Sequence, residues 1–461
     1  MGEQTLKNKL NINPYVFRQY DIRGTVNKDL TEEFVYELGL ACGTYFRRHN
    51  VKTISLGRDC RLSSPTFRDC LVKGLLETGC IIFDAGVIPT PLLYFSLFKW
   101  EVDGGIQITG SHNPPDQNGF KICKGKSTIF GEEIQNIRKI MEKRDFIREG
   151  SGTLIERDIK ESYIEFVSSS IKAGQHKVKA VIDAGNGTGG MIAAPLYKKL
   201  GFDIVELFCE PDGNFPNHHP DPTVVKNMDT LIRTVISEKA DVGIAFDGDA
   251  DRIGVVDEKG EIIWGDQLMI IFSREILKES PGATFIAEVK CSQTLFEDIK
   301  RHGGVPIMWR VGHSLIKAKM KEENAALAGE MSGHIFFSHR YFGYDDAIYA
   351  GARLLEILAG SGKKISELLS DVPKTVTTPE IRVECPDEKK FDVVKRLAEF
   401  FKQNYDVIEI DGARINFDGG WGLIRASNTQ PVLVLRFEAK NETLLEEIRS
   451  KVETKLKEFL T

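Results

Sequence analysis

The chain has 461 residues, which predicts about three or four domains at roughly 100–200 residues per domain. Its composition, 41% hydrophobic and 28% charged, is typical of a globular protein and excludes disordered, collagen-like and coiled-coil classes. The 61 Lys and Arg residues against 67 Asp and Glu give a formal net charge of −6, and because the two signs are interspersed we expect neither nucleic acid nor a membrane as a partner.

No apolar run approaches the ~18 residues that a membrane span requires, and the first residues contain no apolar signal segment. The eight cysteines include no Cys-x-x-Cys pair, so we expect reduced thiols and no zinc site. These features predict a cytoplasmic protein.

Three stretches of the chain share one pattern, in which an apolar strand ends in a polar loop and is followed by a helix, a glycine and a second apolar strand. The first strands with their loops cover residues 53–61, 178–190 and 285–293, and the glycines are Gly79, Gly201 and Gly303. Strand, helix and strand in this order imply right-handed crossovers and mainly parallel sheets. We therefore predict three α/β domains, over residues 1–155, 156–258 and 259–373.

The pattern changes after Pro373, where we predict a separate α+β domain over residues 374–461. The expected elements are a strand at 380–385, a helix at 391–403, short strands within 407–417, 421–427 and 432–439, and a charged helix at 441–459. No linker between the four domains is low in complexity, so we expect them to pack together.

The first motif that suggests chemistry is GGIQITGSHNPPDQNGFKI, residues 104–122. An apolar strand runs into a turn that leaves Ser111 at its carboxyl end, the edge where open α/β sheets bind ligands. Gly110 permits close approach of a ligand, and Pro114 stops the strand. A serine is a nucleophile only when a neighbour accepts or positions its proton, and His112 and Lys121 are the candidates. The alternative is a purely structural turn that ends a strand.

The second motif is ADVGIAFDGDADRIGVV, residues 240–256, in which Asp247, Asp249 and Asp251 alternate after a buried strand. Three neighbouring carboxylates repel one another and favour a hard cation such as Mg²⁺. An EF-hand loop fits poorly because Arg252 stands where that loop needs glycine. A haloacid-dehalogenase-type phosphatase also places Asp-x-Asp after a strand, but the residues that follow here do not fit. An acidic surface turn is the structural alternative.

The third motif is LAGEMSGHIFF, residues 327–337. In an extended conformation Glu330, Ser332 and His334 would share one face, where a carboxylate and a hydroxyl could hold sugar hydroxyls and the histidine could move a proton. The alternative is a structural histidine.

The fourth motif is WGLIRASNTQPVLVLRFEA, residues 421–439. Arg425, Ser427, Asn428 and Thr429 would form a loop between two strands that suits a dianionic phosphate. The alternative is a turn that carries a surface arginine. Two weaker segments contribute Tyr20 and Arg23 (17–24) and Arg310 and His313 (308–317).

Taken together, TGSHNPP (109–115), DGDADR (247–252), GEMSGH (329–334) and RASNTQP (425–431) resemble the α-D-phosphohexomutase superfamily, most closely its bacterial phosphomannomutase/phosphoglucomutase members. The resemblance covers nearly the whole chain. It implies a four-domain architecture of three similar α/β domains, with mixed but mainly parallel sheets, followed by a C-terminal α+β domain.

The resemblance also implies roles for single residues. Ser111 would carry the phosphoryl group and, with Asp247, Asp249 and Asp251, would bind Mg²⁺. Proton transfer and charge stabilisation would fall to Lys121, Arg23, His334 and Arg252. The sugar and its second phosphate would be held by Tyr20, Lys290, His313, Glu330, Ser332, His334, Arg425, Ser427, Asn428 and Thr429.

The expected reaction interconverts hexose 1-phosphate and hexose 6-phosphate, with mannose, glucose or both as the sugar, through a phosphoserine and a hexose 1,6-bisphosphate. Glucose or mannose 1,6-bisphosphate is the expected activator, and a monomer is compatible with the family. A phosphoglucosamine mutase, a Mg²⁺-dependent sugar phosphatase and a sugar-phosphate sensor without catalysis are the alternatives.

Overall fold

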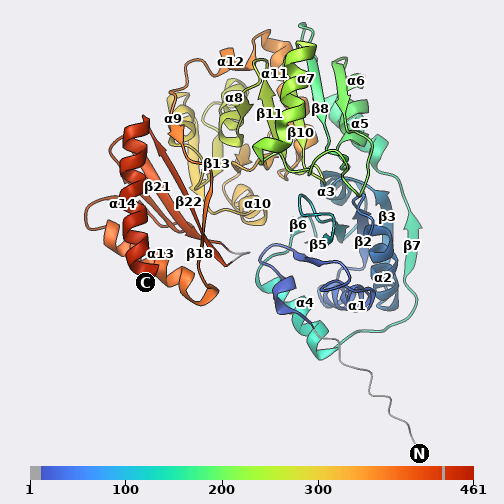
Figure 1. The fold of residues 1–461 in the computed structure, drawn as a ribbon. Helices are drawn as coiled ribbons and strands as arrows, with labels where there is room; N and C mark the ends of the chain where they lie inside the picture. The colour runs from blue at the N-terminus through green and yellow to red at the C-terminus, as the bar shows by residue number, and fades with distance from the viewer. Residues whose placement is uncertain (1–11, 428–430, 461) are drawn as a thin grey trace, which may run out of the picture. The chain divides into compact units, whose positions relative to one another are not determined.

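The computed structural model describes residues 12–427 and 431–460 (Figure 1). The chain forms two compact units. The first unit contains Met1–Val256 and Asp346–Gly360, and the second unit contains Asp257–Asp345 and Ser361–Thr461. None of the described helices is long and apolar enough to cross a membrane.

The first sheet of the first unit has the strand order β1-β5-β4-β2-β3-β7, with β6 paired to β5. Strands β2, β3, β4 and β7 run parallel, and β5 is antiparallel to its neighbours β1 and β4. The strands are β1 (Ile22–Thr25), β2 (Thr53–Arg58), β3 (Ile81–Val87), β4 (Gly104–Ile108), β5 (Gln117–Lys124), β6 (Ser127–Thr128) and β7 (Thr153–Glu156). The helices of this part of the chain are η1 (Pro14–Val16), α1 (Glu32–Arg48), α2 (Ser64–Glu77), α3 (Thr90–Lys99) and α4 (Glu132–Lys143).

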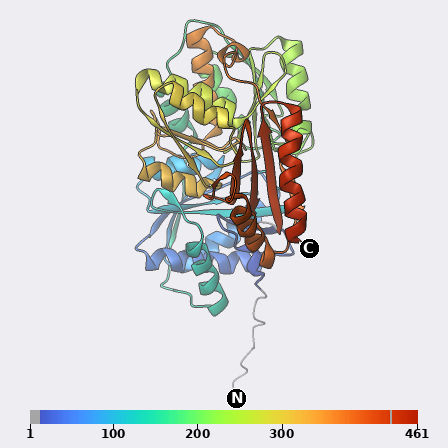
Figure 2. The ribbon, with the colours of Figure 1, turned by 90° about the vertical axis from the view of Figure 1, so that its left-hand side faces the viewer.

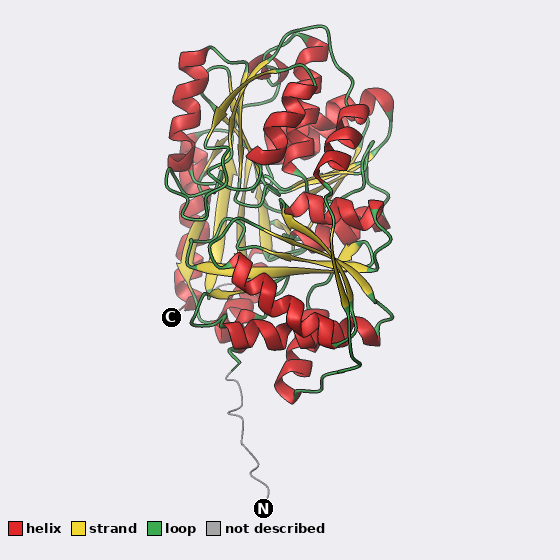
Figure 3. Ribbon diagram, turned by 90° about the vertical axis from the view of Figure 1, so that its right-hand side faces the viewer, coloured by secondary structure: helices red, strands yellow, loops and turns green. Residues whose placement is uncertain are grey.

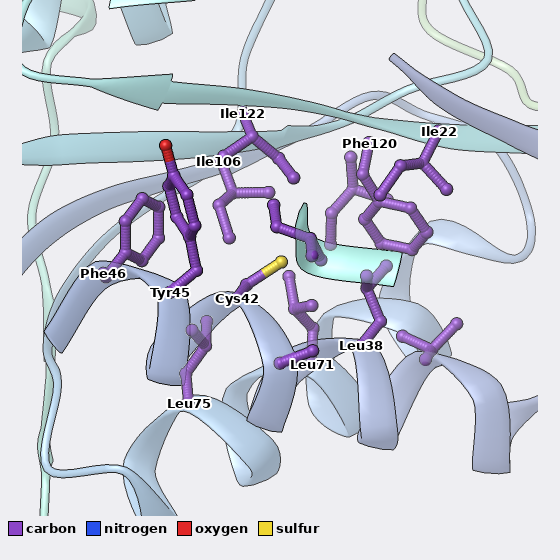
Figure 4. Packing of buried hydrophobic residues seen from close by; sticks show 14 of the residues in the cluster. Ile22, Leu38, Cys42, Tyr45, Phe46, Leu71, Leu75, Ile106, Phe120 and Ile122 are labelled. Atoms are coloured by element: carbon purple, nitrogen blue, oxygen red, sulfur yellow. The ribbon is translucent and has the colours of Figure 1, made fainter. Parts of the chain in front are cut away.

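Helices α1 and α2 cover one face of this sheet and α3 covers the other (Figures 1 and 3). In Figure 4, side chains of α1 and α2 such as Leu38, Cys42 and Leu71 point toward Ile106 and Phe120 of the sheet. All five are buried in one hydrophobic cluster. Burying this apolar surface fixes the sheet from which the site loops emerge.

The second sheet of the first unit contains neighbouring strands in the order β11-β10-β8-β9. Strand β8 runs parallel to both β9 and β10. The elements are α5 (Lys160–Ser170), β8 (Lys179–Asp183), α6 (Gly190–Lys199), β9 (Asp203–Leu207), η2 (Val225–Met228), α7 (Asp229–Glu238), β10 (Val242–Phe246) and β11 (Ile253–Asp257).

Helix α11 (Ala347–Ser361) belongs mostly to the first unit, although it follows the third sheet in the chain. Tyr197 of α6 donates a hydrogen bond to the carbonyl of Ile348 at 2.7 Å, and Tyr163 of α5 donates to Asp346 at 2.9 Å. These buried contacts join α11 to the second sheet. The predicted boundaries at 155, 258 and 373 stay predictions.

The second unit begins with a sheet of order β14-β13-β15-β16, in which β13 is parallel to β14 and β15 and only β16 is antiparallel. The elements are β12 (Ile262–Ile263), α8 (Gly265–Glu279), β13 (Thr284–Glu288), α9 (Gln293–Arg301), β14 (Val305–Trp309), α10 (His313–Glu322), β15 (Leu327–Gly329), β16 (Ile335–Phe337) and α12 (Ile365–Leu368).

The predicted repeat is present in all three sheets. The strand pairs β2/β3, β8/β9 and β13/β14 are parallel, and each pair is joined by one helix. The glycine before each second strand has a positive φ, +80° at Gly79, +89° at Gly201 and +84° at Gly303. An added Cβ would meet nothing within 4 Å at any of them. Backbone conformation, not space, therefore requires glycine at these helix ends.

The C-terminal part of the second unit is an antiparallel sheet of order β17-β22-β21-β20-β19, with β18 paired to β22. Helix α14 lies along this sheet (Figure 2). The elements are β17 (Val376–Thr377), β18 (Ile381–Glu384), α13 (Asp387–Phe401), β19 (Asp406–Ile408), β20 (Ala413–Phe417), β21 (Gly420–Ala426), β22 (Val432–Ala439) and α14 (Glu442–Leu460).

One predicted helix is displaced. The helix expected at 391–403 begins at Asp387 and ends at Phe401. Pro386 occupies the cap position, and Asp387 and Glu388 lie in the first turn, where acidic side chains interact favourably with the helix dipole. The apolar periodicity indicates the buried face of this helix. It gives no sign of the polar first turn, so the predicted start at residue 391 is too late.

Candidate active site

Ser111 lies in the loop between β4 and β5, at the carboxyl end of β4. It is only 2% exposed, and its φ of +49° places it in the left-handed region that non-glycine residues seldom adopt. Its backbone N–H donates to Thr109 Oγ1 at 2.8 Å, and its hydroxyl lies 3.1 Å from His112 Nδ1. The loop is therefore a tight turn that fixes the direction of the serine side chain.

The three aspartates follow β10, in the tight connection to β11. Asp247, Asp249 and Asp251 are fully buried, and carboxylate oxygens of the three lie within 4.8 Å of one another. The Ser111 hydroxyl donates to Asp247 Oδ2 at 2.8 Å, although the two residues are 136 positions apart in the chain. The structure thus brings the serine loop and the acidic loop into direct contact.

Cationic side chains surround this acidic cluster. Lys121 of β5 lies 3.1 Å from Asp249 and also pairs with Asp251. Arg23 of β1 donates to Asn113 of the serine loop at 3.1 Å. Arg252 is half-buried at the end of the acidic loop. Tyr20 is half-buried in the bend before β1.

The residues of the acidic cluster fit a divalent cation. Burial raises the pKa of Asp247 well above its usual value, and the neighbouring charges of Asp251 and Asp249 raise it further. Among the described residues, Asp249 Oδ1 is a buried oxygen with no hydrogen-bond partner. Three hard, buried oxygen ligands with excess negative charge are the donor set that Mg²⁺ prefers.

Sequence reasoning missed the residues that support this cluster. Thr90, the first residue of α3, donates its hydroxyl to Asp249 Oδ2 at 2.5 Å and its backbone N–H to the Asp249 carbonyl at 2.9 Å. Arg61 and Asp59, in the loop after β2, contact the backbone of the serine loop. The one available signal was an Asp-x-Arg pair directly after a buried strand.

In the second unit, the segment Glu330–His334 is the turn of a hairpin between β15 and β16, with the Glu330 N–H donating to the His334 carbonyl at 2.9 Å. The prediction that Glu330, Ser332 and His334 share one face of an extended strand is therefore wrong, because Gly333, at φ +94°, reverses the chain. Glu330 Oε1 accepts a hydrogen bond from the Gly312 N–H at 2.7 Å. Ser332 is half-buried.

The two predicted histidines meet at a buried aspartate that sequence reasoning missed. The rings of His313 and His334 stack with centroids 5.7 Å apart. Asp345 Oδ2 lies 3.2 Å from His334 Nδ1 and 3.8 Å from His313 Nδ1, and Lys317 lies 2.9 Å from its other oxygen. Burial alone would raise the pKa of Asp345, but Lys317 and the histidines hold it well below its usual value. The ionised carboxylate therefore orients the His334 ring.

Lys290 follows β13 and lies beside a second buried acid, Glu288. Its ammonium is 3.6 Å from Glu288 Oε1 and 3.4 Å from Glu380. Glu288 is fully buried and accepts a hydrogen bond from the Met331 N–H in the hairpin turn at 2.9 Å. Burial raises the pKa of Glu288 to about 7, against the opposing effect of Lys290. Glu288 thus connects Lys290 to the predicted sugar-binding turn.

Arg425 lies on β21 and is nearly buried. Its guanidinium pairs with Asp411 at 3.1 Å, and Asp411 also accepts the Val311 N–H at 3.0 Å, in the loop before α10. Ser427 follows β21, and its N–H donates to the Val432 carbonyl at 3.0 Å. The predicted phosphate ligands Asn428 and Thr429 lie outside the described residues.

Comparison with known proteins matches four stretches of the chain to the phosphoglucomutase/phosphomannomutase family. Residues 14–148, 161–260 and 264–376 match its alpha/beta/alpha domains I, II and III, and residues 380–455 match its C-terminal domain. The match confirms the predicted architecture of three α/β domains and a C-terminal α+β domain.

Individual relatives align along nearly their whole length. A phosphomannomutase/phosphoglucomutase of Pseudomonas aeruginosa is 45% identical over 445 residues, which is 96% of this chain and 95% of that protein. A phosphoglucomutase of Neisseria gonorrhoeae is 44% identical over 440 residues, 95% of each. A crystal structure of a phosphoglucomutase/phosphomannomutase family protein from Burkholderia thailandensis superposes with a TM-score of 0.92 at 41% identity, covering 97% of this chain and 98% of that one.

Proposed function

Because the chain belongs to the phosphoglucomutase/phosphomannomutase family, we propose that it interconverts hexose 1-phosphates and hexose 6-phosphates through a phosphorylated Ser111. The observation that carries this proposal is the 2.8 Å hydrogen bond between the Ser111 hydroxyl and Asp247, in a cluster of three buried aspartates. A buried serine beside a cation-binding cluster suits phosphoryl transfer, in which catalysis is mostly positioning and charge stabilisation.

The proposed reaction consists of two transfers with no net consumption of water. In the first, the bond between phosphorus and Ser111 Oγ breaks, and a bond forms between phosphorus and the free hydroxyl oxygen of a hexose phosphate, whose proton passes to a protein base. The product is a hexose 1,6-bisphosphate. In the second, its other phosphoryl group returns to Ser111, and the sugar oxygen left behind is protonated. The sugar must therefore present either end to the same serine.

The residues of the first unit would act at the transferred group. Asp247, Asp249 and Asp251, with the phosphorylated Ser111, would hold Mg²⁺, which supplies positive charge to the transferring phosphoryl oxygens. A phosphoserine adds about −1.5 to −2 charge to the cluster, so positive side chains are needed as well. Lys121 is already in contact with two of the aspartates. Arg23 and Arg252 would supply the remaining positive charge at this group.

The residues of the second unit would hold the sugar. Glu330 and Ser332 would bind neighbouring hydroxyls, with Lys290 and His313 beside them. Arg425, Ser427, Asn428 and Thr429 would bind the phosphate that is not being transferred, and Tyr20 of the first unit would assist in substrate binding. His334 would accept and return the hydroxyl proton, because Asp345 at 3.2 Å fixes the orientation of its ring.

Glucose or mannose 1,6-bisphosphate would act as the activator, because it is the donor that restores phospho-Ser111 when the intermediate escapes. Hexose phosphates would be the only partners that the reaction requires. The eight free cysteines agree with a cytoplasmic location.

The test is a steady-state assay with mannose 1-phosphate, glucose 1-phosphate and glucosamine 6-phosphate, while released inorganic phosphate is measured in parallel. The proposal expects isomerisation of mannose or glucose phosphate with negligible phosphate release, and no isomerisation by Ser111→Ala. Preference for the glucosamine substrate would reassign the chain to phosphoglucosamine mutases. Stoichiometric phosphate release, or wild-type turnover by Ser111→Ala, would contradict the phosphoserine mechanism.

A further inference from the structure

Arg61 is a buried cation to which the proposed mechanism gives no role. It lies in the loop that follows β2, and the residue is 1% exposed. Among the described residues its ionic partner is Asp59, whose Oδ2 accepts from Arg61 Nε at 3.1 Å. The guanidinium also lies over the ring of Phe215, with Cζ 5.2 Å from the ring centroid. A buried arginine is costly unless its remaining donors are satisfied, so the targets of those donors indicate its purpose.

The four terminal donor contacts of Arg61 go to backbone carbonyls, three of them in the serine loop and the fourth at Gln117, the first residue of β5. Nη2 donates to the carbonyls of Ser111 at 2.8 Å and Asn113 at 2.6 Å. Nη1 donates to the carbonyls of Pro114 at 2.6 Å and Gln117 at 2.9 Å. The loop is therefore wrapped around the guanidinium, which takes the place of the backbone hydrogen bonds that a regular strand would provide.

Gly110 of the serine loop also lies very close to the Arg61 guanidinium. An added Cβ on Gly110 would lie 2.4 Å from Arg61 Cζ, so only glycine lets the chain pass this close. The Gly110 N–H donates to Asp59 Oδ2 at 3.1 Å. The next residue, Ser111, has the strained φ of +49° and the hydroxyl that donates to Asp247. A left-handed non-glycine residue persists only where its surroundings impose it.

We infer that Arg61 is a positioning residue for phosphoryl transfer, one that holds the serine loop in the strained turn that aims the Ser111 hydroxyl at the aspartate cluster. This inference rests on the proposed function. Arg61 contacts the carbonyl of Ser111 and not its hydroxyl, so it acts through the backbone. Ser111 must point in the same direction when it gives up its phosphoryl group and when it regains it. A loop held rigidly in one conformation therefore serves both transfers.

The planar fork of the guanidinium is the property that this role requires. Arginine presents donors on two terminal nitrogens in a fixed plane, and here each nitrogen reaches two carbonyls. Lysine would keep the charge beside Asp59 but offers its three donors from a single atom. Arg61→Lys therefore keeps the positive charge but removes the hydrogen bonds that the two terminal nitrogens make to the loop carbonyls.

The test compares Arg61→Lys with Arg68→Lys. Arg68 also forms a guanidinium–aspartate pair in this α/β domain, at 2.6 Å from Asp84, and its other hydrogen bond goes to Asp69 rather than to the serine loop. We expect Arg61→Lys to lower kcat on the order of 100-fold, as a small misplacement of the nucleophile does, with the KM for hexose phosphate unchanged. The transfer of the phosphoryl group from glucose 1,6-bisphosphate to dephosphorylated enzyme slows in parallel. Arg68→Lys keeps the wild-type kcat.

Gly110→Ala probes the same contact from the loop, and it serves if Arg61→Lys does not fold. We expect it to lower kcat as Arg61→Lys does, and we expect the double variant to lose less than the product of the two single losses. A wild-type kcat in either single variant would overturn the inference. So would a rise in KM as large as the fall in kcat, or a double variant whose fold-loss in kcat equals the product of the two single fold-losses. If the wild-type protein itself forms no phosphoserine, the proposed function fails instead.

Discussion

The acidic cluster predicts an unusual response to the loss of one charge. The ligand oxygens of Asp247, Asp249 and Asp251 lie within 4.8 Å of one another, and at that distance two unit charges repel by about 3.5 kcal/mol at an effective dielectric constant of about 20. Lys121 and Arg252 offset part of this repulsion, and a bound cation would offset the rest. The cluster is therefore expected to destabilise the metal-free protein and to stabilise the Mg²⁺ complex.

Asp247→Asn removes one of these charges and keeps the hydrogen bonds. Asp247 Oδ1 accepts the N–H groups of Asp251 at 3.1 Å and Arg252 at 3.2 Å, and an asparagine oxygen can do the same. The amide that replaces Oδ2 can donate to the Ser111 oxygen. We expect the metal-free variant to unfold at a higher temperature than the metal-free wild type, while its activity falls by several powers of ten, each worth about 1.4 kcal/mol.

The effect should depend on pH in a definite direction. The folded-state pKa of Asp247 is raised, chiefly by burial and then by Asp251 and Asp249. Its contribution to the stability of the metal-free wild type is therefore present at low pH and is lost as the pH rises through that pKa. Protons compete with Mg²⁺ for the same oxygens, so the rise in unfolding temperature produced by Mg²⁺ should be larger at about pH 8 than at about pH 6.

Thermal unfolding with EDTA or with Mg²⁺ measures both effects. Asp241→Asn is the matched control, because Asp241 precedes β10 and Asp247 follows it. The control should keep the full Mg²⁺ response, and Asp247→Asn should lose it. A metal-free Asp247→Asn protein less stable than the wild type at about pH 8, or a Mg²⁺ response that does not grow with pH, would refute the reasoning from charge repulsion.

Three further outcomes are expected. Arg425→Ala should chiefly raise the KM for hexose phosphates in steady-state kinetics, because the phosphate it would bind is not transferred; a loss confined to kcat would contradict this. Since burial raises the pKa of Glu288 to about 7, its stabilising contribution is lost as the pH rises through 7, and Glu288→Gln should flatten the fall in unfolding temperature on the alkaline side. Gly79→Ala should cost about 1 kcal/mol of stability with kcat unchanged, because its φ is +80° and no atom opposes a Cβ; no change in a denaturant titration would be the contrary result.

The parts of this protein that could be predicted from its sequence are those encoded locally. The strand, helix and strand units were visible because apolar runs, helical periodicity and a glycine follow one another within about 35 residues. Ser111 and the three aspartates stood out because they follow buried strands, at the carboxyl edge where open α/β sheets bind ligands. The comparison with relatives confirms the family that these motifs indicated.

The parts that could not be predicted depend on contacts between distant positions. Arg61 bonds carbonyls about 50 residues away, and Asp345 reaches His313 across 32 positions, so no periodicity could connect them. The alternation of polar residues at 330–334 fits an extended strand as well as the end of a hairpin. Gly333 was the residue that distinguished the two, through its positive φ.

The central claim is that Ser111 carries the phosphoryl group, and mass spectrometry tests it most directly. The purified protein is incubated with glucose 1,6-bisphosphate and Mg²⁺, its intact mass is measured, and its peptides are mapped. We predict an addition of about 80 Da that maps to Ser111, disappears on incubation with excess hexose 1-phosphate and is absent from Ser111→Ala. A fully active protein with no such addition, or with the phosphate on an aspartate of the cluster, would contradict the account.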